Sequence, residues 1–198
     1  NAMSNQSVAE DSALSFQFAA NVFNDVDAGD SLTYTATMSD GSPLPTWLSF
    51  NANTRTFSGT PSNGDVGAID IKVTATDGKS ASATDTVAIT VSNTNDAPTV
   101  TSTAVTSSTQ GTAYSYTFAA SDVDSGDTLT YAAATLPSWL SFNTSTGVLS
   151  GTPTSGNVGN QSIVLNATDS SGAKATDSFT IYVAGLPAIT AASLTNIS

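Results

Sequence analysis

The chain contains no cysteine and no histidine, and only one of its 16 acidic residues, Glu10, is a glutamate. The missing cysteine excludes disulfide bridges and zinc sites built from thiolates. Without histidine or cysteine there is no Ser-His-Asp triad and no cysteine nucleophile. Because few side chains are left that could act as general acids or bases near neutral pH, we do not expect an enzyme.

Basic residues are also scarce, since four Lys and Arg face 16 Asp and Glu and give a formal charge of −12. Four cations cannot neutralise a phosphate backbone, so nucleic acid is not an expected partner. No apolar run approaches the length of a membrane span, and no signal peptide is recognisable, so membrane insertion is not expected. Asn1-Ala2-Met3 resembles the remainder of a cleaved expression tag, which suggests a segment taken from a larger protein.

Small hydroxyl side chains dominate what is present, with 30 serines and 32 threonines among 198 residues. They alternate with β-branched and aromatic residues, as in the segment where Ile69, Ile71 and Val73 are separated by Asp70 and Lys72. Alternation of period two is typical of strands with one buried face and one wet face. The sequence therefore predicts an all-β protein.

An internal repeat organises the chain. Leu44–Asn51 recurs 92 residues later as Leu136–Asn143, and Gly59-Thr60-Pro61 recurs at the same offset as Gly151-Thr152-Pro153. Both Gly-Thr-Pro segments are interpreted as turns. Each copy contains about seven short strands at the spacing of a β-sandwich. The predicted domains are residues 4–95, residues 96–185, and a tail of residues 186–198 that either starts a further repeat or adds an edge strand.

Both copies contain, in the same order, an aromatic strand, Asp-x-Asp, Pro-x-Trp-Leu, Gly-Thr-Pro, Val-Gly and a late Ala-Thr-Asp. With these motifs the chain resembles the dystroglycan-type cadherin-like repeat and the immunoglobulin-like repeats of bacterial surface proteins. The resemblance implies two tandem Greek-key β-sandwich domains of the cadherin or immunoglobulin type. It also implies a secreted or cell-surface location and a role in adhesion, spacing or polysaccharide contact rather than catalysis.

In cadherins, which the chain also resembles, calcium lies between successive domains, and acidic residues occur here at similar places. The residues at those places are Glu10, Asp11, Asp65, Asn93, Asn95, Asp96, Asp122 and Asp124. Calcium takes six to eight oxygen ligands, which carboxylates and amide carbonyls supply. The resemblance therefore implies a calcium ion as cofactor at the junction, where it would fix the angle between the domains. In the Asp-Val-Asp segment, alternation predicts that Val123 points into the core.

The first copy carries a related half-site, formed by Asp25, Asp27 and Asp30, which an upstream neighbour would complete. The junction after the second copy, Gly185-Leu186-Pro187, has no acid. A different interpretation of all these aspartates is that they cap turns through their own backbone. Asp77 and Asp169, at the ends of predicted strands, are interpreted as such turn residues.

The leading functional hypothesis is a non-enzymatic extracellular adhesion or spacer module. Its partners would be neighbouring repeats, polysaccharide or another cell-surface protein. One alternative is a polysaccharide-binding module attached to a secreted hydrolase, which needs a row of exposed aromatic rings. The candidates for that row are Tyr114, Tyr116, Tyr131 and Tyr182, whereas Trp47 and Trp139 are predicted to be buried. The other alternative is a passive stalk without a ligand.

Overall fold

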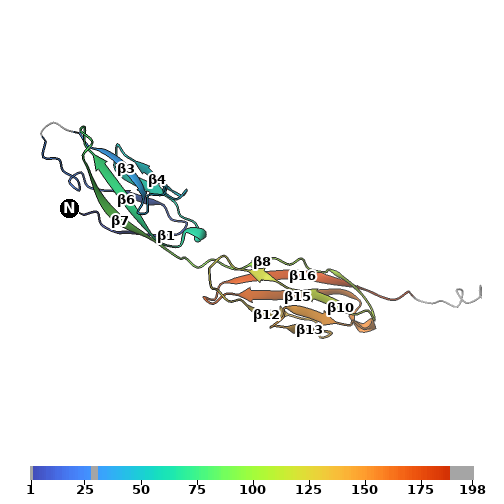
Figure 1. Ribbon diagram of the computed structural model, residues 1–198. Helices are drawn as coiled ribbons and strands as arrows, with labels where there is room; N and C mark the ends of the chain where they lie inside the picture. The colour runs from blue at the N-terminus through green and yellow to red at the C-terminus, as the bar shows by residue number, and fades with distance from the viewer. Residues whose placement is uncertain (1, 28–30, 188–198) are drawn as a thin grey trace, which may run out of the picture. The chain divides into compact units, whose positions relative to one another are not determined.

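The computed structural model describes residues 2–27 and 31–187, and almost all of its regular structure is β-strand (Figure 1). The chain forms two compact units, unit 1 (Asn1–Thr94) and unit 2 (Asn95–Ser198). Each unit is a sandwich of strands, so the predicted all-β fold with two tandem β-sandwiches is confirmed. The tail beyond residue 187 lies outside the described residues.

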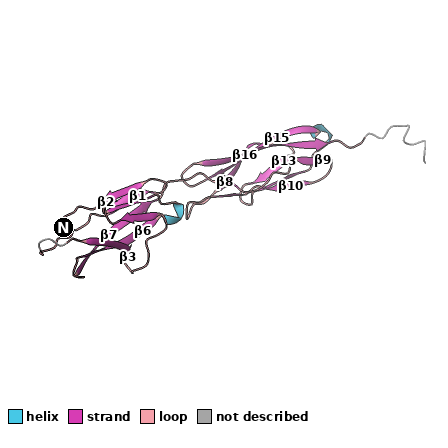
Figure 2. Cartoon of the chain, turned by 90° about the horizontal axis from the view of Figure 1, so that it is seen from above, coloured by secondary structure: helices cyan, strands magenta, loops and turns pink. Residues whose placement is uncertain are grey.

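The described helices are two single turns of three residues each, η1 (Asn63–Asp65) and η2 (Ser155–Asn157), drawn in cyan in Figure 2. Within the described part of the chain, neither has the length or the apolar character that a membrane crossing requires. Both turns begin at the same place in the repeat, one residue after a Gly-Thr-Pro segment.

Unit 1 contains seven strands within its described residues. They are β1 (Gln6–Ala9), β2 (Leu14–Gln17), β3 (Thr33–Met38), β4 (Leu48–Asn51), β5 (Thr56–Gly59), β6 (Gly67–Thr76) and β7 (Ser82–Ser92). One sheet has the order β1-β7-β6-β3 and the other β2-β5-β4. Strand β1 runs parallel to β7, and the other neighbours are antiparallel.

Unit 2 repeats this topology and adds one short ladder. Its strands are β8 (Thr99–Val100), β9 (Ser107–Thr109), β10 (Tyr114–Thr117), β11 (Ala120–Ser121), β12 (Thr130–Thr135), β13 (Leu140–Asn143), β14 (Val148–Gly151), β15 (Gly159–Thr168) and β16 (Lys174–Ala184). The two main sheets have the orders β12-β15-β16-β9 and β10-β14-β13, and β8 pairs with β11. The additional β8–β11 ladder ties the segment that enters unit 2 to its sandwich.

The core of each unit lies between its two main sheets and follows the alternation of the sequence. In β6, Ile71, Val73 and Ala75 are buried, and in β15 the matching buried residues are Ile163 and Leu165. Trp47 and Trp139 are only partly buried and pack against these cores. The tryptophans are therefore structural, as predicted, although less enclosed than predicted.

The two cores differ in chemistry at one pair of positions on their second sheet. Unit 1 carries Leu14 and Phe16, whereas unit 2 carries Tyr114 and Tyr116. Burial raises the pKa of Tyr114 to about 12 and also raises the pKa of Tyr116. The Tyr114 hydroxyl donates to the carbonyl of Val105 at 2.7 Å, which further favours its protonated form.

This difference predicts that unit 2 loses stability at alkaline pH. The unfolded chain loses the tyrosine proton near pH 10, whereas the folded unit keeps it until about pH 12. The contribution is therefore present below pH 10 and is lost as the pH rises toward 12. We expect calorimetry to show unit 2 melting progressively earlier over this range, relative to unit 1. Tyr114→Phe should reduce that loss, and an unchanged alkaline profile in this variant would contradict the assignment.

Candidate cation site

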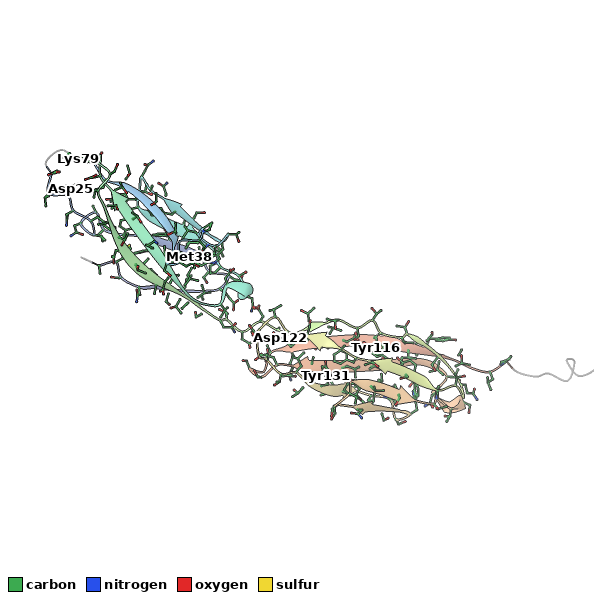
Figure 3. The ribbon with its side chains drawn as sticks, viewed as in Figure 1. Asp25, Met38, Lys79, Tyr116, Asp122 and Tyr131 are labelled. Carbon is green, nitrogen blue, oxygen red and sulfur yellow. The ribbon has the colours of Figure 1, made fainter. Side chains whose placement is uncertain are left out.

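Three carboxylates converge at one end of unit 2. Asp122, Asp127 and Asp169 each place an oxygen within 4.8 Å of the other two. Asp122 directly follows β11, Asp127 lies in the turn before β12, and Asp169 directly follows β15. Three connections therefore deliver one acid each, and Figure 3 labels Asp122 at that end of the unit. We call these residues the acid cluster.

The acid cluster brings three carboxylates close together in a largely shielded place. The Oδ2 atoms of Asp122 and Asp127 are shielded from solvent and have no hydrogen-bond partner among the described residues. Asp169 is only 5% exposed. Carboxylates held this close repel one another, and a buried oxygen without a partner is costly. An all-oxygen donor set of this kind fits a hard divalent cation such as calcium.

Asp169 is held in its ionised form by its surroundings. Its Oδ2 accepts a hydrogen bond from the side-chain amide of Asn95 at 2.9 Å, and its Oδ1 accepts from the backbone N–H groups of Ser171, Gly172 and Ala173. These bonds, with that of Asn95 contributing most, lower the pKa of Asp169 below its ordinary value. The predicted turn role is therefore real, but the same carboxylate also belongs to the acid cluster.

The segment that enters unit 2 is fastened beside the acid cluster. The backbone N–H of Asp96 donates to Oδ2 of Asp124 at 2.8 Å, and the N–H of Asp124 donates to Oδ1 of Asp122 at 3.0 Å. Unit 2 thus brings together four residues that the sequence singled out, Asn95, Asp96, Asp122 and Asp124. Because Asp122 to Asp124 form a turn rather than a strand, Val123 is 62% exposed, and its predicted burial is wrong.

Glu10 is the most unusual acid of unit 1. It directly follows β1, is only 2% exposed, and its Oε1 accepts from the backbone N–H of Thr94 at 2.6 Å. Its Oε2 is buried and has no hydrogen-bond partner among the described residues. Glu10 therefore connects the start of unit 1 to its last residue and retains one unused oxygen.

The other predicted ligands of unit 1 serve the backbone or face solvent. Asp65 Oδ2 accepts from the N–H and Oγ of Ser62, and Asn157 makes the same two bonds in unit 2. Because the amide of Asn157 makes in unit 2 the bonds that the carboxylate of Asp65 makes in unit 1, this contact caps η1 and does not need a charge. Asp11 has a left-handed φ of 56° and donates its N–H to a loop carbonyl, and Asn93 is exposed.

The half-site of unit 1 is partly described. Asp25, Asp27 and Asp77 line a hollow of about 300 Å³, and the ammonium of Lys79 lies 2.8 Å from Asp27 Oδ2. Figure 3 labels Asp25 and Lys79 at the same end of the unit. Both partners of the ion pair are more than half exposed, so it contributes little stability. Asp30, the third predicted member, lies outside the described residues.

Sequence reasoning missed Asp127 and Asp169 as members of the acid cluster. Asp127 stands 97 residues after Asp30, the offset that also relates Asp122 to Asp25, and Asp169 stands 92 residues after Asp77. The internal repeat therefore contained a usable signal. It was weak because a turn and a ligand use the same residue type, and because three separate connections must meet before the cluster exists.

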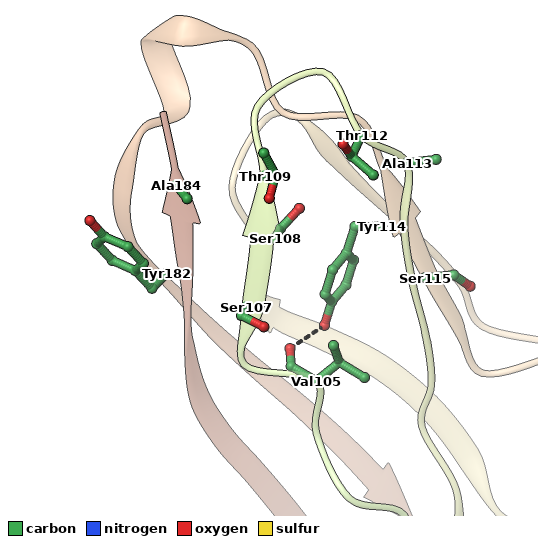
Figure 4. A pocket seen from close by; sticks show the side chains of 10 residues that line it. All are labelled: Val105, Ser107, Ser108, Thr109, Thr112, Ala113, Tyr114, Ser115, Tyr182 and Ala184. Atoms are coloured by element: carbon green, nitrogen blue, oxygen red, sulfur yellow. Dashed lines mark hydrogen bonds between the residues drawn. The ribbon is translucent and has the colours of Figure 1, made fainter. Parts of the chain in front are cut away.

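The row of aromatic rings that a polysaccharide site needs is not formed by the tyrosines of unit 2. Tyr114 and Tyr116 are each only 5% exposed, Tyr131 is partly buried, and Tyr182 is 57% exposed. A hollow of about 400 Å³ lies beside β9 and β10. Tyr114 and Tyr182 both line this hollow, and Figure 4 shows their rings apart from each other, with β16 and β9 between them.

Comparisons with known proteins agree with the fold. Residues 1–92 and 97–184 each match the family model described as "Putative Ig domain". The chain is 36% identical over 136 residues to the "Serine-rich adhesin for platelets" of Staphylococcus aureus strain MRSA252, which covers 69% of this chain but 10% of that protein. This supports the resemblance to bacterial immunoglobulin-like repeats, whereas the dystroglycan type stays a prediction.

Solved cadherin structures have a similar fold. The human CDH23 EC21-23 structure is 20% identical, with a TM-score of 0.56, and the match covers 91% of this chain and 72% of that one. The protocadherin GammaB4 extracellular domain is 19% identical, with a TM-score of 0.54, and the match covers 91% of this chain and 33% of that one. At these identities the likeness establishes the β-sandwich fold alone.

Proposed function

Because the chain belongs to the Putative Ig domain family, we propose that it is a non-enzymatic adhesion and spacer module of a larger secreted or surface protein, with calcium as its cofactor. The match to part of a staphylococcal adhesin supports the extracellular role. The scarcity of general acids and bases supports the absence of catalysis. Neighbouring repeats of the same polypeptide are the proposed partners.

One observation carries the calcium proposal, namely the acid cluster with two shielded oxygens that have no hydrogen-bond partner in the described residues. Asp122, Asp127 and Asp169 would supply the first carboxylate ligands. Asp96 and Asp124 lie next to them, tied by hydrogen bonds, and add further oxygens. This approaches the six to eight oxygens that calcium requires, with water completing the set.

The predicted contribution of unit 1 is part of the same proposal. Glu10 supports it, because a shielded carboxylate oxygen without a partner is poised to meet a cation. Asp11, Asp65 and Asn93 were predicted as further ligands, and of these Asp65 already accepts two hydrogen bonds within its own turn. An ion that takes ligands from both sides of Thr94 would stiffen the connection between the repeats.

Calcium titration by calorimetry, together with thermal melts in calcium and in chelator, tests this proposal. An ion that binds only the folded state stabilises it by about 2.7 kcal/mol at a hundredfold excess over Kd. We expect binding heat and a higher melting temperature in calcium, and both should disappear in the double variant Asp122→Ala/Asp124→Ala. If the unaltered chain gives neither heat nor a shift, the acids are turn caps and the chain is a passive stalk.

A further inference from the structure

Unit 2 holds an extended segment, Asn95–Thr101, against its own sandwich, and we call this segment the docked linker. Its first residue donates a side-chain hydrogen bond to Asp169, and its second donates a backbone hydrogen bond to Asp124. Farther along, β8 pairs with β11, and the N–H of Thr101 donates to the carbonyl of Ala119 at 2.9 Å. Carboxylates at one end and a backbone edge at the other thus hold the docked linker.

Unit 1 has the same receiving groups at the repeat offsets. Asp77 corresponds to Asp169, Asp27 to Asp124, and Ala19 to Ala119. Between these groups lie three hollows of about 300, 420 and 330 Å³, which we call the acid, middle and inner hollows. The acid and middle hollows share Phe23, Asn24 and Ala83 in their walls, and the middle and inner hollows share Ala2 and Val22.

We propose that these hollows form one groove, which receives an extended segment of the type Asn-Asp-x-Pro-Thr-Val supplied by a preceding repeat and joined ahead of Ala2. Ala2 borders the middle and inner hollows, so a segment joined ahead of it would start beside the middle hollow, whose walls continue through the acid hollow to Asp27 and Asp77. Strands β1 and β9, which begin the two sandwiches, correspond at an offset of 100 residues, and this offset places Thr101 at position 1. A segment with the length of the docked linker would therefore end at position 1, directly before Ala2.

Two differences between the units define how the segment is held. The connection at residues 21–24 is three residues longer in unit 1 than in unit 2, and Phe23 is buried against Phe18 and Tyr34. The incoming segment consequently packs over this connection rather than forming the β8–β11 ladder. In addition, Lys79 bonds Asp27, whereas unit 2 has Ser171 at that position. The incoming backbone N–H must therefore compete with an ammonium for Asp27.

This inference does not rest on the calcium proposal, because the hydrogen bonds and the packing need no ion. In the test, a copy of the docked linker replaces Asn1 in the full chain, and thermal melts are recorded in chelator. A Gly-Ser segment of the same length is the matched control. We expect unit 1 to melt at least about 4 °C higher with the linker copy than with the control, which corresponds to roughly 1 kcal/mol for a domain of this size.

Changes to the receiving groups complete the design. Within the grafted chain, Asp27→Asn/Asp77→Asn should remove much of the gain, whereas Lys79→Ser should enlarge it by freeing Asp27 for the incoming N–H. Equal melting temperatures of the grafted and Gly-Ser chains in chelator would overturn the groove. That result would not affect the calcium proposal, which the titration tests separately. Conversely, a chain that binds no calcium could still show the gain in melting temperature in chelator.

Discussion

We expect Gly151→Ala to lower the melting temperature of unit 2 by at least about 12 °C, and Gly59→Ala to do the same to unit 1. A Cβ atom at position 151 would lie 2.1 Å from the carbonyl oxygen of Trp139, and at position 59 it would lie 1.9 Å from that of Trp47. The obstructing atoms are backbone and cannot turn away. Overpacking of this kind costs about 3 kcal/mol, and each kcal/mol shifts the melting temperature of such a domain by about 4–8 °C.

Each unit also offers a matched control for this experiment. At Gly64 and Gly156 the nearest atom to an added Cβ is a hydroxyl oxygen, at 4.0 and 3.8 Å respectively. Gly64→Ala and Gly156→Ala should therefore change stability by no more than about 0.5 kcal/mol. Differential scanning calorimetry of the four variants measures the contrast. Similar melting temperatures for Gly151→Ala and Gly156→Ala would contradict the steric explanation.

This geometry revises the sequence interpretation of Gly-Thr-Pro as a turn. Gly59 is the last residue of β5, the middle strand of its sheet, where it lies opposite both Leu14 and Leu48. A left-handed backbone conformation at a turn is not what requires glycine here, because Gly59 does not have a positive φ. Glycine is needed because the backbone carbonyl of the Trp in the Pro-x-Trp motif occupies the space that a Cβ atom would take. The Gly-Thr-Pro and Pro-x-Trp motifs, which both mark the repeat, therefore contact each other.

The strands, their buried faces and the two-domain organisation could be predicted, because they depend on local sequence patterns and on the repeat. Alternation along β6 and β7 identified strands and their buried faces, because side chains of a strand point to opposite faces in turn. The repeat predicted two similar domains. The linker residues Asn95 and Asp96 were found through motif order, and they do lie beside Asp122 and Asp124.

The composition of the acid cluster could not be predicted in the same way. Asp127 and Asp169 are 42 residues apart, and only the folded sheet brings their turns together. A carboxylate that caps a turn and one that binds a cation look alike in a sequence. Asp65 illustrates the reverse case, because it was chosen for its position but is occupied by two hydrogen bonds from Ser62.

Asp127→Asn is expected to change the stability of unit 2 in opposite directions with and without calcium. In chelator, the substitution removes one of three mutually repelling carboxylates, whose Oδ2 is shielded and has no partner among the described residues. The Oδ1 contact with Ser170 is available to an amide oxygen as well. The apo form of the variant should therefore melt above the apo form of the unaltered chain.

In calcium the order should reverse. The unaltered chain gains about 2.7 kcal/mol at a hundredfold excess over Kd, whereas the variant loses a charged ligand and most of that gain. Asp70→Asn is the matched control, because it makes the same change of charge on an exposed residue of β6 outside the cluster. Thermal melts of the unaltered chain, Asp127→Asn and Asp70→Asn in calcium and in chelator measure this reversal, which we call the crossing. A turn cap alone would make Asp127→Asn destabilising or neutral in both buffers, so a crossing confined to this variant would identify Asp127 as a cation ligand.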